Sequence, residues 1–183
     1  ANGVGMALAE RWMETQFGGD VVDHHTYVMC GDGCLMEGIS AEAASLAGHL
    51  NLSKLVVLYD DNNITIDGGT DITFSESVSK RFEAYGWDVQ RIDGHDRDAI
   101  SSAISKAKKS DKPSLICCKT VIAHSAPTKA GTSGAHGAPL GEQEIAQTKT
   151  ILGMDPNVHF SVPKSVLDFF QSENSDRKSM NDA

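Results

Sequence analysis

The sequence has no long apolar run and few basic residues. No stretch approaches the roughly 18 consecutive apolar residues that a membrane-spanning helix needs, and residues 1–10 show neither a basic region nor a signal-cleavage pattern. The 16 basic side chains are outnumbered by 25 acidic ones, which gives a formal net charge of -9. Because a net negative surface repels nucleic acid and anionic lipids, we expect a soluble protein that binds neither. A local phosphate site is compatible with this charge.

Cysteine is also scarce. The four cysteines are Cys30, Cys34, Cys117 and Cys118, and none of them forms a CxxC pair. Neither a zinc site nor a disulfide framework is therefore expected. The chain of 183 residues, 40% hydrophobic and 22% charged, has the composition of one soluble domain with a buried core.

Strand and helix patterns alternate along the chain. Residues 55–59 form a continuous apolar run of strand length, which is typical of a parallel strand buried on both faces. The other patterns predict strands at 26–30, 87–92 and 114–122 and helices at 2–16, 37–50, 78–85, 98–109 and 142–152. This alternation indicates an α/β fold, a doubly wound and mostly parallel sheet with helices on both faces.

Two further segments are defined by their composition. Residues 123–140 are rich in Gly, Ala, Pro, Ser and Thr, so we expect a long loop of the kind that carries function. Residues 172–183 are polar and predict a tail or linker. We assign residues 1–171 to a single domain.

Two polar turns follow neighbouring strands of the predicted sheet. Gly31-Asp32-Gly33 comes after the first strand and Asp61-Asn62-Asn63 after the second. Ligands of open α/β sheets bind outside the carboxyl ends of the strands, so both turns can face one crevice. Either turn alone is most simply a tight turn or a helix cap, but the two together at this spacing favour a ligand site.

The side chains of these turns suit a metal and a diphosphate. Asp32 offers a carboxylate and Asn62 an amide oxygen, which are hard ligands for Mg²⁺ or Ca²⁺, and the Ile64 carbonyl is a candidate third ligand. Gly33 lets the backbone approach a diphosphate at a helix start. Gly31, Gly33 and Gly38 do not match the dinucleotide fingerprint, and the sequence has no GxxxxGK. A nicotinamide-dinucleotide site and a nucleoside-triphosphate site are therefore disfavoured.

The residues around these turns resemble the transketolase family. The matching segments are residues 31–40 (GDGCLMEGIS), 45–50 (SLAGHL), 59–62 (YDDN), 64–68 (ITIDG), 81–87 (RFEAYGW) and 136–140 (HGAPL). The resemblance runs from about residue 1 to residue 170. Most of these strings are more specific than the pairing of Gly-Asp-Gly with a downstream Asn, which thiamine-diphosphate enzymes share.

The resemblance implies roles for residues of both turns. Asp32, Asn62 and the Ile64 carbonyl would bind the metal, Mg²⁺ or Ca²⁺, and Gly33 would contact the diphosphate of thiamine diphosphate. Members of this family transfer a two-carbon ketol unit from a ketose phosphate to an aldose phosphate, and this chain would supply the diphosphate half of the site.

The resemblance also implies roles for residues outside the turns. Ile66 and Ile122 would pack against the thiazolium ring. His136 would lie near the reacting carbon, where an imidazole suits proton transfer. Glu37 and Glu42 match positions of a carboxylate network between the two active sites of a dimer. The simpler interpretations are a solvent-facing loop histidine and two exposed helix glutamates.

In this family the cofactor lies between two subunits. The aminopyrimidine is held by a second domain of the partner, and that domain is outside this sequence, so the chain alone is expected to be inactive. The resemblance implies a cytoplasmic homodimer of the pentose phosphate pathway, with plastid and peroxisome also open. A non-catalytic transketolase-like dimerisation module is the alternative of another class.

The sequence departs from the family pattern near the expected pocket. After Ile122, most members continue with Gly, an aromatic residue, Gly and Ser, whereas this chain has residues 123–126 (AHSA). Ser133 stands where a histidine is usual. Together with residues 162–170 (VPKSVLDFF), this loop leaves dihydroxyacetone synthase, a relative that uses formaldehyde as acceptor, as an alternative.

Overall fold

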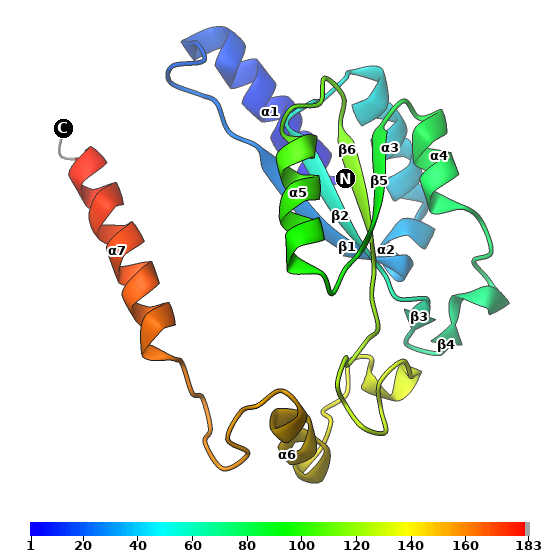
Figure 1. Ribbon diagram of the computed structural model, residues 1–183. Helices are drawn as coiled ribbons and strands as arrows, with labels where there is room; N and C mark the ends of the chain where they lie inside the picture. The colour runs from blue at the N-terminus through cyan, green and yellow to red at the C-terminus, as the bar shows by residue number, and fades with distance from the viewer. Residues whose placement is uncertain (182–183) are drawn as a thin grey trace. The chain divides into compact units, whose positions relative to one another are not determined.

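A computed structural model describes residues 1–181, and its centre is a sheet of four parallel strands. The strands are β1 (Thr26–Gly31), β2 (Leu55–Asp61), β5 (Asp88–Asp93) and β6 (Ser114–Lys119), and they lie in the order β1-β2-β6-β5 (Figure 1). The short strands β3 (Ile64–Thr65) and β4 (Gly68–Gly69) form a separate antiparallel pair.

Alternate residues of the central strands enter two different cores. In β2, Leu55, Val57 and Tyr59 belong to one buried cluster, whereas Val56 belongs to another. This division follows from the period of two in a strand, which turns successive side chains to opposite faces. The two central strands therefore need the near-continuous apolar composition that the sequence shows.

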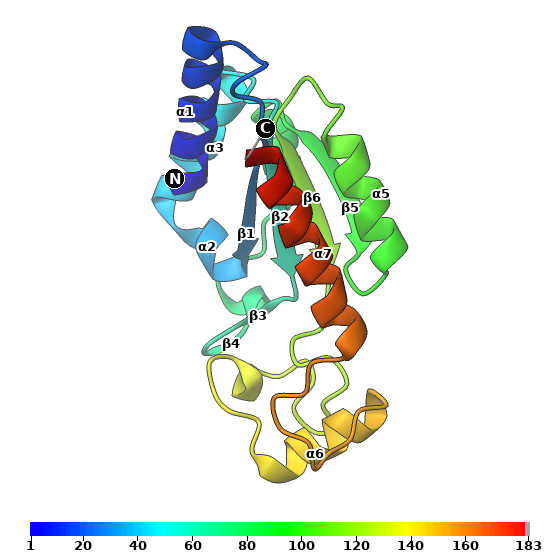
Figure 2. The same ribbon diagram turned by 90° about the vertical axis from the view of Figure 1, so that its left-hand side faces the viewer.

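Helices cover both faces of the sheet. The first face is covered by α1 (Asn2–Phe17), α2 (Asp32–Met36), α3 (Gly38–His49) and α4 (Val78–Ala84), and the second by α5 (Arg97–Ala107). Figure 2 shows α1 and α3 on one side of the sheet and α5 on the other. The predicted α/β fold with helices on both faces is thus what the structure has.

Strand order explains why α5 changes sides. The chain runs from β1 to β2 and then past β6 to β5, with its connecting helices on the first face. From β5 it turns back to β6 through α5. Since parallel crossovers are right-handed, reversing the direction of travel along the sheet places the connection on the opposite face.

The chain folds as two compact units. One comprises residues 1–124 and 128–140 and the other residues 125–127 and 141–183. The second unit contains α6 (Glu142–Ile151) and α7 (Lys164–Asn181). Among the described helices, none combines the length and the apolar character that a membrane span requires.

Three elements differ from the sequence-based expectation. The glycine turn after β1 enters a short helix, α2, and Glu37 in extended conformation separates it from α3. The strand predicted over 114–122 ends at Lys119. Helix α7, which the sequence did not predict, continues through residues 172–181, where no Gly or Pro interrupts it; residues 182–183 lie outside the described part, and the assignment of 172–183 as a polar tail or linker stays a prediction. The domain boundary at 171 stays a prediction.

Helix α3 approaches the end of α4 closely. The indole Nε1 of buried Trp87 donates to the Ala44 carbonyl at 2.8 Å. One turn further along α3, a Cβ built on Gly48 would overlap the Tyr85 carbonyl oxygen. Only glycine therefore allows this separation without a shift of the backbone.

We expect Gly48→Ala to lower the free energy of unfolding by about 1–3 kcal/mol, the usual cost of overpacking. Gly38→Ala in the same helix is the matched control, since a Cβ on Gly38 would project into open space. Urea unfolding of the complete protein measures both. Equal stability of the two variants would contradict the close packing of α3.

Candidate functional site

The two polar turns identified in the sequence lie side by side at the carboxyl edge of the sheet. Strand β1 ends at Gly31, which is in register with Asp60 near the end of β2. Asp32 begins α2, and Asn62 follows β2 directly. Parallel pairing therefore brings the two turns to one edge, as the sequence predicted.

Asp32 is the buried acid of this edge. Its side chain is only 3% exposed. The Tyr59 hydroxyl donates a hydrogen bond to Oδ1, and the backbone N–H of Asn63 donates to Oδ2 at 3.0 Å. Burial raises the pKa of the Asp32 carboxyl above its ordinary value, while the hydrogen bond from Tyr59 acts in the opposite direction. The carboxylate thus accepts hydrogen bonds from β2 and from the loop that follows it.

Asn62 is half-buried, and its side chain is held by hydrogen bonds to neighbouring residues. Its Oδ1 accepts a hydrogen bond from the Ile64 N–H at 2.9 Å, and its Nδ2 donates to Asp60 Oδ2 at 3.1 Å. The next residue, Asn63, has a left-handed backbone with φ 61°, which asparagine tolerates better than most residues. An amide oxygen has two lone pairs, so Oδ1 keeps one for a further partner.

Residues at the end of β6 fasten this loop. The Lys119 ammonium donates to Asn63 Oδ1 and lies 3.5 Å from Asp61 Oδ1. The neighbouring hydroxyl of Thr120 donates to Asp60 Oδ1. Asp60 and Asp61 at the end of β2, and Asn63 just beyond it, therefore have partners at the end of β6, which restricts the loop that carries Asn62.

A cavity of about 350 Å³ opens beside Asp32. Its wall includes Tyr59, Asp61, Arg91 and Lys119, so positive and negative groups share it. Among the side chains in the described part, no group of three or more His, Cys, Asp or Glu is placed to hold a metal ion. A cation at Asp32 would consequently need amide, carbonyl and ligand oxygens to complete its shell.

The backbone at Gly33 is open to solvent. This residue is exposed in the first turn of α2, and a Cβ built on it would meet no atom within 4 Å. Its backbone is therefore open to an approaching ligand, and the N–H groups that begin a helix have no acceptor within the helix. The donor set and this open backbone fit a diphosphate with a divalent cation.

The other predicted site residues are more exposed. Ile66 is 68% exposed. Ile122 is half-buried, and the Ile122 carbonyl accepts a hydrogen bond from the Gly131 N–H at 2.9 Å. His136 is exposed and follows the short helix η2 (Ser133–Ala135). Glu37 and Glu42 are also exposed, at the start and in the middle of α3. Their proposed roles stay predictions.

The family model described as transketolase, thiamine diphosphate binding domain, matches residues 1–183. The chain belongs to this family. Its relatives include Transketolase 1 of Aliivibrio fischeri, 57% identical over 169 residues, and the chromosomal transketolase of Cupriavidus necator, 55% identical over 173 residues. The matches cover 90% and 92% of the chain but 25% and 26% of the relatives. The chain thus spans about a quarter of the length of the curated relatives it matches.

Solved transketolases have the same fold. The enzyme of Campylobacter jejuni matches with a TM-score of 0.88 at 47% identity, covering 90% of this chain and 26% of that one. A transketolase from Pichia stipitis, in complex with sedoheptulose 7-phosphate, matches with a TM-score of 0.91 at 42% identity, covering 98% of this chain and 27% of that one. The resemblance in the sequence is confirmed at the level of the family and the fold.

The loop after β6 departs from the transketolase pattern at left-handed positions. Ala123 has φ 50° and Ser125 has φ 72°. Both stand where the family pattern has glycine, which adopts this conformation without steric cost. An L-residue pays about 1–2 kcal/mol for it. The two departures therefore place backbone strain next to Ile122.

His95 is a residue of this edge that the sequence did not single out. Its ring stacks on that of His124, with centroids 4.0 Å apart, and its Nε2 accepts a hydrogen bond from the Val121 N–H at 2.9 Å. The loop after β5 thereby supports the loop after β6. The one available signal was its position just after a predicted strand.

Tyr59 could have been found from the strand pattern. It shares the period of two with Leu55 and Val57, so it faces the same core, and its place near the end of β2 brings its hydroxyl to the edge. The strand pattern does not predict which residue accepts the hydrogen bond from Tyr59, because Asp32 lies on a different strand-helix connection.

We expect Tyr59→Phe to lower the free energy of unfolding by about 1.5–3 kcal/mol at neutral pH, the value of a hydrogen bond to a charged group. Removing a donor to the ionised form raises the Asp32 pKa further. The loss of stability should therefore be largest above that pKa and shrink as acid protonates the carboxyl. Unfolding curves at several pH values check this. A pH-independent difference would contradict a charged acceptor.

Proposed function

We propose that the complete protein containing this chain is a transketolase. It would transfer a two-carbon ketol unit from a ketose phosphate to an aldose phosphate with thiamine diphosphate and Mg²⁺ or Ca²⁺. The observation that carries the proposal is the buried carboxylate of Asp32 beside the open backbone of Gly33, in a chain of the transketolase family.

The chain's part is to hold the diphosphate and the metal. Asp32, Asn62 and the Ile64 carbonyl would supply hard oxygen ligands, and diphosphate oxygens would complete the shell. Bound there, thiamine diphosphate supplies the carbanion chemistry that cleaves and forms the carbon–carbon bond. Burial of Asp32 strengthens its attraction for a cation, because less water screens the charge.

Three residues are proposed to act around the reacting carbon. Ile66 and Ile122 would offer apolar contact to the thiazolium ring, which their exposed or half-buried side chains leave available. His136 would move a proton at that carbon, since imidazole can accept or donate one near neutral pH. Its exposure on loop 123–140 leaves the ring accessible to a substrate.

The proposed assembly is a homodimer in the cytoplasm. The aminopyrimidine half of the cofactor would be held by a pyrimidine-binding domain of the partner. Glu37 and Glu42 are exposed at α3 and would join carboxylates across that interface. Burying an acidic side chain at an interface costs free energy unless the carboxylate is paired or shares a proton. Only a partner surface that offers such pairing would therefore fit Glu37 and Glu42.

The acceptor sugar is a separate question from the cofactor. The strained loop at Ala123 and the residue Ser133 lie on the stretch that departs from the family, so they are the places where acceptor preference would change. Parallel assays with ribose 5-phosphate and with formaldehyde distinguish a transketolase from a dihydroxyacetone synthase. A protein that binds cofactor but converts neither acceptor would be a non-catalytic module.

We expect Asp32→Ala to weaken binding of thiamine diphosphate in the presence of Mg²⁺ by about three decades. Two unit charges at about 4 Å interact by ~4 kcal/mol at an effective dielectric constant of 20, and this attraction is lost with the carboxylate. Calorimetric titration measures the affinity. Asp111→Ala is the control, because this exposed acid precedes β6 at the opposite end of the strand. Unchanged affinity in Asp32→Ala would remove the metal assignment.

We expect His136→Ala in the complete enzyme to lower turnover much more than cofactor affinity. General acid or base groups contribute about 10² to 10⁴ in rate, whereas a neutral hydrogen bond to a ligand is worth roughly 0.5–1.5 kcal/mol. Steady-state rates at saturating cofactor and calorimetry separate the two effects. If the variant kept half of the wild-type turnover while binding cofactor weakly, His136 would be a phosphate contact only.

A further inference from the structure

Two cysteines bracket the turn that carries Asp32. Cys30 is the second-last residue of β1, and Cys34 lies in the first turn of α2, with only Gly31, Asp32 and Gly33 between them. Because α2 begins directly after β1, the chain changes direction between the two cysteines. Both line a cavity of about 420 Å³ between the sheet and the helices of its first face.

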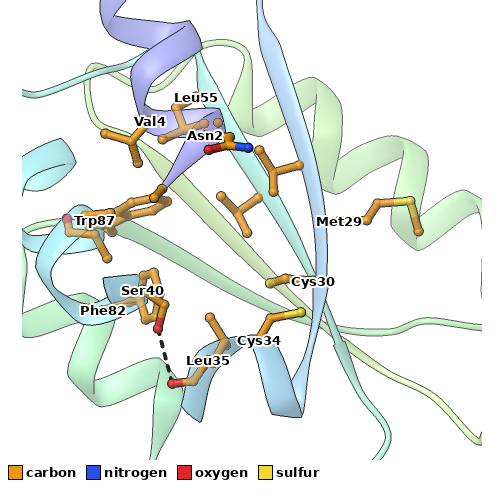
Figure 3. A pocket seen from close by; sticks show the side chains of 16 residues that line it. Asn2, Val4, Met29, Cys30, Cys34, Leu35, Ser40, Leu55, Phe82 and Trp87 are labelled. Atoms are coloured by element: carbon orange, nitrogen blue, oxygen red, sulfur yellow. Dashed lines mark hydrogen bonds between the residues drawn. The ribbon is translucent and has the colours of Figure 1, made fainter. Parts of the chain in front are cut away.

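The side chains of Cys30 and Cys34 both face this cavity. Figure 3 shows the sulfur of Cys34, on α2, close to the side chain of Cys30 on β1. Burial raises the pKa of the Cys30 thiol to about 12, and Cys34 contributes in the same direction. Cys34 is exposed and Cys30 half-buried, so a reagent can reach the pair from solvent.

The remaining cysteines provide a contrast. Cys117 and Cys118 are adjacent in the sequence, yet both are buried, and they belong to the clusters on opposite faces of the sheet. Successive strand residues point away from each other, so one ligand cannot bind both sulfurs. Pairing of thiols in this chain is therefore decided by the fold, and it favours the two cysteines that are further apart in sequence.

We propose that Cys30 and Cys34 form a dithiol site for soft electrophiles that take two sulfur donors, with trivalent arsenicals as the chemical class. Sulfur ligands bind soft centres in preference to hard ones. With phenylarsine oxide, two S–H bonds and the arsenic–oxygen bond break, and two arsenic–sulfur bonds form. The oxygen leaves as water with both protons. Arsenic stays trivalent, so no oxidant is needed.

Occupation of the dithiol site would affect the cofactor site, a consequence that rests on the proposed function. The bridge closes a ring that contains Gly31, Asp32 and Gly33. Asp32 would bind the metal and Gly33 would face the diphosphate, so the ring would compete with the geometry that the cofactor requires. Thiamine diphosphate with Mg²⁺ should in turn weaken retention of the bridge at equilibrium, since coupling between two binding sites is reciprocal.

The test uses the complete protein and phenylarsine oxide. Intact mass and peptide mapping should find one phenylarsenic group on the peptide that contains Cys30 and Cys34. A monothiol in excess should leave it bound, and a dithiol should remove it. Cys30→Ser and Cys34→Ser should each weaken retention by about 10²-fold or more, because the second sulfur binds intramolecularly. Cys117→Ser is the matched control and should retain the group as the wild type does.

The possible results are separable. If the monothiol strips the wild type as fast as Cys30→Ser, with both proteins folded by circular dichroism, the proposal is wrong. Should Cys30→Ser not fold, Cys34→Ser at the exposed position gives the same comparison. A bridge that is retained against the monothiol equally well with and without bound cofactor contradicts the coupling alone. Failure to bind cofactor with the bridge still forming would refute the proposed function and leave the dithiol site standing.

Discussion

The carboxylate of Asp32 is the constraint on which this edge of the molecule depends. A charge that is nearly removed from water costs several kcal/mol unless hydrogen bonds replace the solvent. Here the replacements are the Tyr59 hydroxyl and the Asn63 N–H. They come from β2 and the loop beyond it, so the end of β1 and the end of β2 must keep their register for the acid to stay satisfied. A metal ion would bind the same carboxylate. The hydrogen bonds from Tyr59 and Asn63 also fix the orientation of this carboxylate.

The parallel sheet determines which residues surround Asp32. Right-handed connections put α2, α3 and α4 on one face of the sheet and α5 on the other, and loops follow β2 and β6 at the carboxyl edge. Lys119, the last residue of β6, donates a hydrogen bond to Asn63 in the loop after β2. The next residue, Thr120, donates to Asp60 near the end of β2. His95, after β5, supports the loop after β6. Each loop at this edge is thus held by a neighbouring strand end, which is how short polar segments keep a defined geometry without a core of their own.

Two features of this chain lie at an edge that it shares with the transketolase family. Ala123 takes a backbone conformation that glycine adopts at less cost, so the loop next to Ile122 carries strain. Cys30 and Cys34 place two thiols on either side of the Asp32 turn. Both features adjoin the proposed cofactor site without belonging to its predicted ligands, and they are where this protein would differ in specificity and in sensitivity to thiophilic reagents.

The sequence by itself determined the α/β class, the four strands, the family and the pair of turns with Asp32 and Asn62, because apolar periods and short motifs are local. It did not contain α2, which begins in the predicted glycine turn and ends before the helix expected from residue 37, or the end of β6 at Lys119, since such boundaries depend on neighbouring segments. Which residue satisfies Asp32 was decided only when parallel pairing brought Tyr59 to it from another strand. The pairing of cysteines likewise needed three dimensions: a strand turns Cys117 and Cys118 apart, whereas a strand that turns directly into a helix brings Cys30 and Cys34 together.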